Sequence, residues 1–162
     1  MIAGIEFAEL LDYTAQETSR WKELFVKNPA ALDLAIDIAG TGTVRRLLQH
    51  IFFVELHFAN AVLGLPPVSF ESFSAGNVNQ LFAVNEEAML KYRQFLSTAK
   101  PEDWTDKVDL GPRVDFKPSK RKLVTQALTH SMRHWAQMAT FLRQQGFKQD
   151  WVHDFLLSNA ME

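Results

Sequence analysis

Apolar residues recur at the spacing of an α-helix in four separate stretches of this chain. The stretches cover about residues 5–27, 43–64, 77–96 and 119–145 of a sequence of 162 residues. In each stretch the apolar side chains return every three or four positions, which places them on one face of a helix. Four amphipathic helices without a convincing sheet pattern predict an all-α protein, a four-helix bundle in which the apolar faces bury one another.

Residues with strong capping preferences mark the ends of these helices. Thr43 stands where the second helix begins, and Gly64 stands just before two prolines that forbid its continuation. Asn77 and Gln80 have the spacing of a capping box at the start of the third helix. Gly146 is expected to cap the end of the fourth helix.

The segments between the predicted helices 2 and 3, and between helices 3 and 4, are both long. Residues 105–122 alternate around a Gly-Pro pair, which predicts a short hairpin or an extended loop. Long connections do not require simple up-down-up-down packing, so periodicity leaves the topology open. A chain of this length has room for one full-sized core, and we therefore expect a single domain over residues 1–162.

The composition of the chain limits the classes of partner and of chemistry that it can have. The chain is 47% hydrophobic, and its formal net charge of −2 at pH 7 gives no general attraction to nucleic acid or to anionic lipid. No secretory signal or membrane-spanning run is evident, so a soluble cytoplasmic protein is expected. The absence of cysteine excludes disulfides, thiolate ligands and a cysteine nucleophile. Histidine and carboxylate side chains must then carry any metal or acid–base chemistry.

Three histidines occupy matching positions on two of the predicted helices. His130 and His134 are one turn apart and about 40° apart around the fourth helix, at the edge of its apolar face. His50 occupies the corresponding edge of the second helix. If the helices are neighbours, these imidazoles can converge on one divalent ion and leave positions open for water and substrate. The alternative is that each is a half-buried histidine with an ordinary hydrogen bond.

Two stretches of sequence resemble a known family. They are "LLQHIFFVELHFANAVLGL" and "LTHSMRHWAQMATFLRQQGF", which resemble the DinB-like (damage-inducible, YfiT-related) four-helix-bundle proteins. The resemblance implies an up-down-down-up bundle with a long crossover, a metal held by His50, His130 and His134, and a homodimer. It also implies a metal-dependent activity that differs between members, including hydrolysis, thiol-dependent S-transfer and a thiol-assisted isomerisation.

Several polar residues are further candidates for the site, each with a structural alternative. Second-sphere or pocket residues are Asn85, Gln126, Gln137 and His57. Asn85 would otherwise bond to another helix, and the remaining three would otherwise be surface or boundary residues. Glu55 falls about 140° from His50 around the helix, which makes it a poor fourth ligand and favours a paired carboxylate or an interface residue.

A basic cluster stands at the start of the fourth helix. Lys117, Lys120 and Arg121 are candidates for binding an anion at the free amides of this helix end. Such an anion could belong to the substrate or to a thiol cosubstrate. A solvated helix start is the alternative.

The expected function is metal-dependent activation of a small nucleophile. No G-x-S-x-G, P-loop, dinucleotide or H-E-x-x-H motif is present. A divalent ion (Zn, Ni, Fe or Mn) would activate a low-molecular-weight thiol, or water, for attack on a small electrophilic substrate. Thiol-dependent transfer is favoured. A metal-dependent hydrolase and a non-catalytic metal- or ligand-binding stress protein are the alternatives.

Aromatic residues at the helix edges bear on assembly. Phe52, Phe53 and Trp135 fall partly outside the best apolar arcs, which suggests more apolar surface than one small bundle buries. Together with the resemblance, this predicts a homodimer that packs through helix faces.

Overall fold

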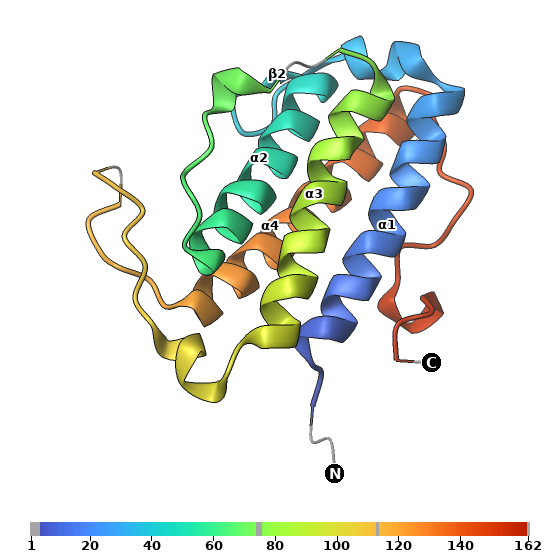
Figure 1. The fold of residues 1–162 in the computed structure, drawn as a ribbon. Coiled ribbons are helices and arrows are strands. Elements are labelled where there is room, and N and C mark those ends of the chain that lie inside the picture. Colours follow the sequence, from blue (N-terminus) through green and yellow to red (C-terminus); the bar gives the residue numbers. More distant parts are fainter. Residues whose placement is uncertain (1–3, 74–75, 113, 162) are drawn as a thin grey trace.

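Four helices form the body of the protein. The structure is a computed structural model that describes residues 4–73, 76–112 and 114–161. The helices are α1 (Phe7–Lys27), α2 (Val44–Leu63), α3 (Val78–Thr98) and α4 (Lys120–Gln144). Figure 1 shows α1 and α4 ascending while α2 and α3 descend, which confirms the predicted up-down-down-up bundle. No helix in the described part of the chain is long and apolar enough to cross a membrane.

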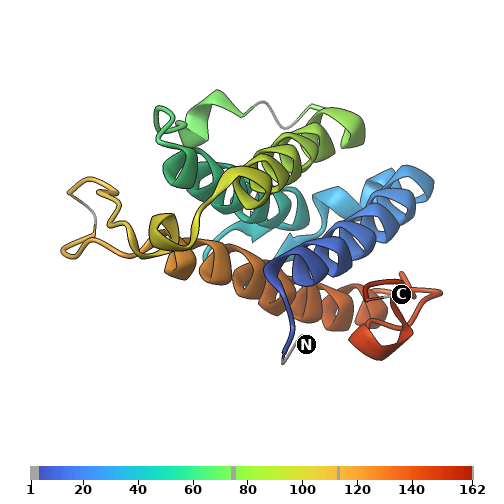
Figure 2. The ribbon, with the colours of Figure 1, turned by 60° about the horizontal axis from the view of Figure 1, so that its bottom comes forward.

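The helices form a closed ring of neighbours, as the view in Figure 2 makes clear. α2 packs against α3 and α4, and α1 packs against the same two helices from the other side. Because α2 and α3 are parallel, the connection between them must return along the bundle, and its described residues include the short helix η2 (Phe70–Ser72). This crossover allows α2 and α4 to lie side by side.

The capping residues expected from the sequence begin and end the helices. The Thr43 hydroxyl accepts a hydrogen bond from the Arg46 amide, and Gly64 ends α2 with φ of 69° in the left-handed region. Asn77 and Gln80 form both hydrogen bonds of the predicted capping box, each 3.0 Å long. α4 differs slightly, because Gln145 is its cap residue and Gly146 follows it with φ of 88°.

Short elements occupy the other connections. Between α1 and α2 lie the 3-10 helix η1 (Pro29–Asp33) and an antiparallel pair of two-residue strands, β1 (Ala35–Ile36) and β2 (Gly42–Thr43). After α3 comes η3 (Pro101–Thr105), followed by an extended loop that a single bridge between Lys107 and Ser119 closes. The described part of this segment is therefore the extended loop that the alternating pattern allowed.

Two apolar clusters fill the bundle, one toward each end, with polar side chains between them. One cluster includes Trp21, Phe25 and Phe82, and the other includes Tyr92 and Leu128. Between the clusters lies a buried polar layer, to which every helix contributes: Thr14 and Thr18, Glu55, Asn85, and Ser131. The core is therefore divided at mid-height.

The interpretation of the edge aromatics is wrong for Phe52 and Trp135. Phe52 is 0% exposed and Trp135 is 4% exposed within one chain, where Phe52 packs edge-on against Phe82 and Trp135 stacks on Trp21. Phe53 is half-buried and contacts Phe70 of the crossover. Each helix has two neighbours, so its buried arc is wider than a single stripe. Phe52 and Trp135 therefore supply no surface for a dimer.

The C-terminal segment folds back against α1 and is held there by polar contacts. His153 Nδ1 lies 2.6 Å from Glu17 Oε2, and the Trp151 indole donates to the same oxygen at 3.3 Å. The Tyr13 hydroxyl donates to the backbone carbonyl of His153. His153 therefore helps to attach this C-terminal segment, which includes the short helix η4 (Phe155–Leu157).

Candidate metal centre

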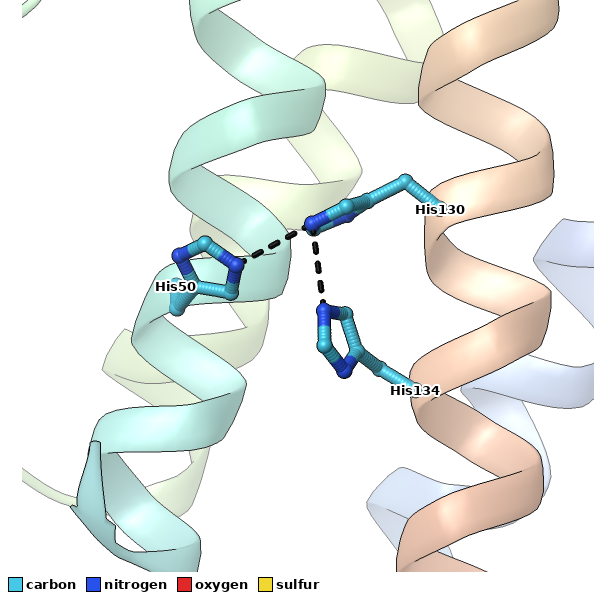
Figure 3. Close-up of side chains that lie close together, drawn as sticks. All are labelled: His50, His130 and His134. Atoms are coloured by element: carbon cyan, nitrogen blue, oxygen red, sulfur yellow. Dashed lines mark hydrogen bonds between the residues drawn. The ribbon is translucent and has the colours of Figure 1, made fainter. Parts of the chain in front are cut away.

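The three predicted ligands meet between α2 and α4. His50 projects from α2, and His130 and His134 project from consecutive turns of α4 toward it (Figure 3). Among the described residues, these three histidines form a group of potential ligands close enough together to share one metal ion. The i, i+4 spacing aligns the two rings on α4, and the crossover places α2 beside them. Local periodicity and the topology of the bundle thus build the cluster together.

The distances within the cluster fit metal coordination. His50 Nε2 lies 3.0 Å from His130 Nε2, which lies 3.2 Å from His134 Nε2. With metal–nitrogen bonds of about 2.1 Å, such pairs subtend angles of roughly 90° to 100° at a common ion. These angles lie between the octahedral and tetrahedral values. Three imidazoles so arranged would occupy one side of the ion.

The environment of the rings favours their neutral form. His130 and His134 are 7% and 2% exposed, while His50 is half-buried. Burial, with the neighbouring histidines next in effect, lowers the pKa of His130 from 6.5 to about 3. Burial also lowers the pKa values of His50 and His134. Neutral imidazole is the form that binds metals, so at neutral pH protons compete little for these nitrogens.

Gln137 orients one of the rings. Its side-chain oxygen lies 2.8 Å from His134 Nδ1. Because an amide oxygen only accepts hydrogen bonds, Nδ1 carries the ring proton and Nε2 is left with a free lone pair. Such a bond to the outer nitrogen fixes the tautomer and orientation that ligation needs. The corresponding nitrogen of His130, Nδ1, is buried and has no hydrogen-bond partner in the described chain.

The other second-sphere candidates lie away from the ligating nitrogens. Gln126 is exposed one turn before His130, and its backbone carbonyl accepts from Thr129. His57 lies two turns beyond His50 along α2, stacked on Phe53, and lines a separate cavity of about 270 Å³ under the loop at 108–111.

The basic cluster is also separate from the histidines. Lys117 pairs with Asp109 and Lys120 pairs with Asp106, in both cases at 3.0 Å. Lys120 and Arg121 begin α4, about 15 Å along the helix axis from His130. An anion held there would not contact an ion held by the triad.

Asn85 and Glu55 belong to one buried network on the inner side of α2. The Asn85 amide donates to Glu55 Oε2 at 2.7 Å, and Glu55 Oε1 lies 2.5 Å from the Ser131 hydroxyl. Burial raises the pKa of Glu55 from 4.5 to about 7. Asn85 and Glu55 each stood out in the sequence as a polar residue within an apolar helix face, but Ser131 carried no signal beyond its place beside His130. The network joins α2, α3 and α4 at the height of the triad.

Arg133 lies at the site although the sequence did not predict it as a site residue. Its Nη2 atom lies 3.3 Å from His134 Nε2, the ligating nitrogen, although the side chain is exposed. Its positive charge also lowers the pKa values of all three histidines. The helix angle of Arg133 places its Cα outside the histidine stripe, and only the length of the side chain brings the guanidinium to the ligands.

Comparison with known proteins agrees with this architecture. The family model for the DinB family matches residues 2–160. The search of curated proteins found no match. Among solved structures, the crystal structure of a DinB-like protein, YjoA, from Bacillus subtilis aligns over 86% of this chain and 91% of that chain, with a TM-score of 0.59 and 18% identity. At that identity the likeness establishes a common fold, and the family match extends over nearly the whole sequence. The chain belongs to the DinB family.

Proposed function

We propose that this protein is a metal-dependent enzyme in which His50, His130 and His134 hold a divalent ion that activates a small nucleophile. The observation that carries the proposal is the convergence of three Nε2 atoms at 3.0 and 3.2 Å. The cluster in the described residues contains no fourth histidine and no carboxylate. A protein site with three ligands and open positions is typical of catalytic rather than structural metal centres.

The ion would supply Lewis acidity, which lowers the pKa of a water or thiol that enters its open positions. The chain supplies the rest of the site. His134 is held by Gln137, His130 is buried, and the half-buried His50 is the most exposed of the three rings. The buried network of Glu55 keeps α2 and α4 in register beneath the ligands.

We favour a thiol as the nucleophile because the chain has no cysteine of its own and a thiolate attacks soft electrophiles readily. In the transfer, the thiol loses its proton to solvent, its sulfur bonds to the electrophilic carbon, and the leaving group departs with the electron pair of the broken bond. Hydrolysis, in which water attacks in the same way, is the alternative.

The test compares metal-loaded wild type with His130→Ala and with the matched variant His57→Ala. The substrates are chlorodinitrobenzene and an epoxide, each with and without cysteine, glutathione or coenzyme A, and nitrophenyl acetate for hydrolysis. We expect thiol-dependent turnover that falls more than about 100-fold in His130→Ala and little in His57→Ala.

The remaining outcomes separate the alternatives. Thiol-independent ester cleavage that depends on His130 would favour hydrolysis. Stoichiometric metal binding without turnover of any substrate would favour the metal-binding stress protein. Thiol-dependent turnover that survives His130→Ala at full rate would contradict the proposed mechanism.

A further inference from the structure

The guanidinium of Arg133 lies beside His134 Nε2, and no acidic side chain among the described residues pairs with it. Its hydrogen-bond contact is His134 Nε2, at 3.3 Å. No ion pair joins Arg133 to a carboxylate in the part of the chain that the structure describes. An arginine with donors to spare is suited to binding oxyanions such as carboxylate and phosphate.

The two helices that carry the ligands have almost no negative charge to offset this cation. The acidic residue of α2 is Glu55, which is 0% exposed and points to the inner network. α4 has no acidic residue and five basic ones, which are Lys120, Arg121, Lys122, Arg133 and Arg143. The chain as a whole is slightly acidic. The two helices of the candidate centre therefore carry a net positive charge, whereas the chain as a whole carries a net negative charge.

A metal ion on the triad would change the bonding of Arg133. A nitrogen that gives its lone pair to a metal cannot also accept a hydrogen bond, so Arg133 would lose its contact with His134 Nε2. Any ion bound to that nitrogen lies within about 2.1 Å of it, and hence at most about 5.4 Å from Arg133 Nη2. Two cations this close repel each other, and three neutral imidazoles do not reduce the charge of the ion.

We propose that Arg133 selects anionic substrates for the centre, with a carboxylate or phosphate bridging the ion and the guanidinium. One oxygen can lie about 2.1 Å from the ion while an oxygen of the same group lies about 2.9 Å from a guanidinium nitrogen, which spans the separation above. The inference rests on the proposed metal centre and adds the chemical class of its substrate. Arg133 is then a specificity-determining residue.

The test uses cobalt(II) as the metal, because its visible absorption reports both its own binding and the entry of a new ligand. Wild type, Arg133→Gln and the matched variant Arg143→Gln are first titrated with cobalt. Each loaded protein is then titrated with acetate, with inorganic phosphate and with the neutral ligand imidazole. The exposed Arg143 lies on the same helix, about 15 Å along its axis from Arg133.

In Arg133→Gln we expect weaker binding of the anions without weaker binding of cobalt or imidazole. The dissociation constant for acetate or phosphate rises about threefold to tenfold, since a charge-assisted contact is lost at a partly solvated position. Cobalt affinity stays equal or increases because a repulsive neighbour is gone. Imidazole binding does not change, and Arg143→Gln behaves as wild type. The comparison of acetate with phosphate shows which oxyanion the site prefers.

A purely structural role would weaken cobalt, imidazole and anion binding together, and that result would overturn the inference. Unchanged anion affinity in Arg133→Gln, or an equal loss in Arg143→Gln, would overturn it as well while leaving the metal centre intact. Failure of the wild type to bind cobalt would instead overturn the proposed centre, and this inference with it.

Discussion

At the residue scale, Glu55 is a fully buried carboxyl group, and burial is costly for such a group if it stays ionised. The hydrogen bonds around it fit the protonated form, because the Ser131 hydroxyl also lies 3.0 Å from the Ala127 carbonyl, to which it can donate its single proton. Protonated Glu55 can then donate to Ser131 Oγ while its other oxygen accepts from Asn85. The pKa near 7 reflects the burial of this carboxyl group.

This raised pKa predicts a stability that depends on pH. The folded state holds the proton of Glu55 more tightly than the unfolded state, so the contribution is fully present below about pH 4.5 and is lost as the pH rises to about 7. The total loss is about 3 kcal/mol. In Glu55→Gln the amide can satisfy both neighbours without a charge, so we expect a variant that exceeds the wild type in unfolding free energy at pH 8 and approaches it at pH 4.5.

Urea denaturation across this pH range measures the effect. Glu23→Gln, at an exposed position of α1, serves as the control and should follow the wild type. A difference between Glu55→Gln and wild type that did not vary with pH would show that Glu55 is not protonated on folding.

The bond from Gln137 to His134 Nδ1 predicts a graded effect on metal affinity. Gln137→Ala should weaken binding about tenfold, because the ring then loses the contact that fixes its tautomer and direction. Gln126→Ala provides the matched control, since it lies on the same helix and is exposed. Isothermal titration with zinc compares the two, and equal losses in both variants would argue against a specific role for Gln137.

At the scale of elements, the capping box of α3 holds the end of the crossover. Replacing Asn77 by Ala removes the side-chain acceptor of the Gln80 amide and should lower the free energy of unfolding by about 1 kcal/mol. Asn79→Ala, two residues inside the same helix and exposed, should leave the stability nearly unchanged. Chemical denaturation gives both values. If Asn77→Ala were as stable as Asn79→Ala, the cap would contribute nothing in solution.

The helices and their ends could largely be predicted from the sequence, because periodicity and capping depend on residues that are close together in the chain. The first helix was expected over 5–27 and runs from Phe7 to Lys27, and both Thr43 and Asn77 cap as expected. Contacts between distant segments could not be predicted in the same way. Glu17 and His153 are 136 residues apart, and no spacing rule connects them.

The candidate site likewise combines local features that the sequence predicts with long-range contacts that it does not. Helix angles put His50, His130 and His134 on matching edges of their helices, but they did not show that Glu55 and Asn85 would bond to each other. Nor could they show that the side chain of Arg133 bends back to the ligands, since an angle describes the Cα and not the end of a long side chain. The topology that brings the helices together came from the family resemblance, not from periodicity.

At the scale of the whole molecule, the crossover makes the site possible. It places α2 and α4 side by side and antiparallel, so that a ligand from the first half of the chain meets two from the second half. The polar layer lies at the same height and ties three helices together through Glu55. Metal binding should therefore stabilise the contact between α2 and α4 in particular.

The homodimer stays a prediction. It now rests mainly on the family resemblance, because Phe52 and Trp135 are buried within one chain. Light scattering should give a mass near twice the 18.5 kDa of one chain. A mass of one chain that did not change over a wide range of protein concentration would contradict it.

The central claim is that three histidines form a metal centre, and metal stoichiometry tests it most directly. Protein purified without a metal-affinity tag is loaded with zinc, dialysed and assayed by elemental analysis, for wild type, each of His50→Ala, His130→Ala and His134→Ala, and the controls His57→Ala and His153→Ala. We predict one ion per chain in the wild type and both controls, and a marked loss in the three ligand variants. Because the pKa of His130 lies near 3, His130 should not release the ion by protonation as the pH falls through the usual imidazole range near 6.5. Wild-type protein that retains no zinc, or ligand variants that retain as much as the controls, would contradict the account.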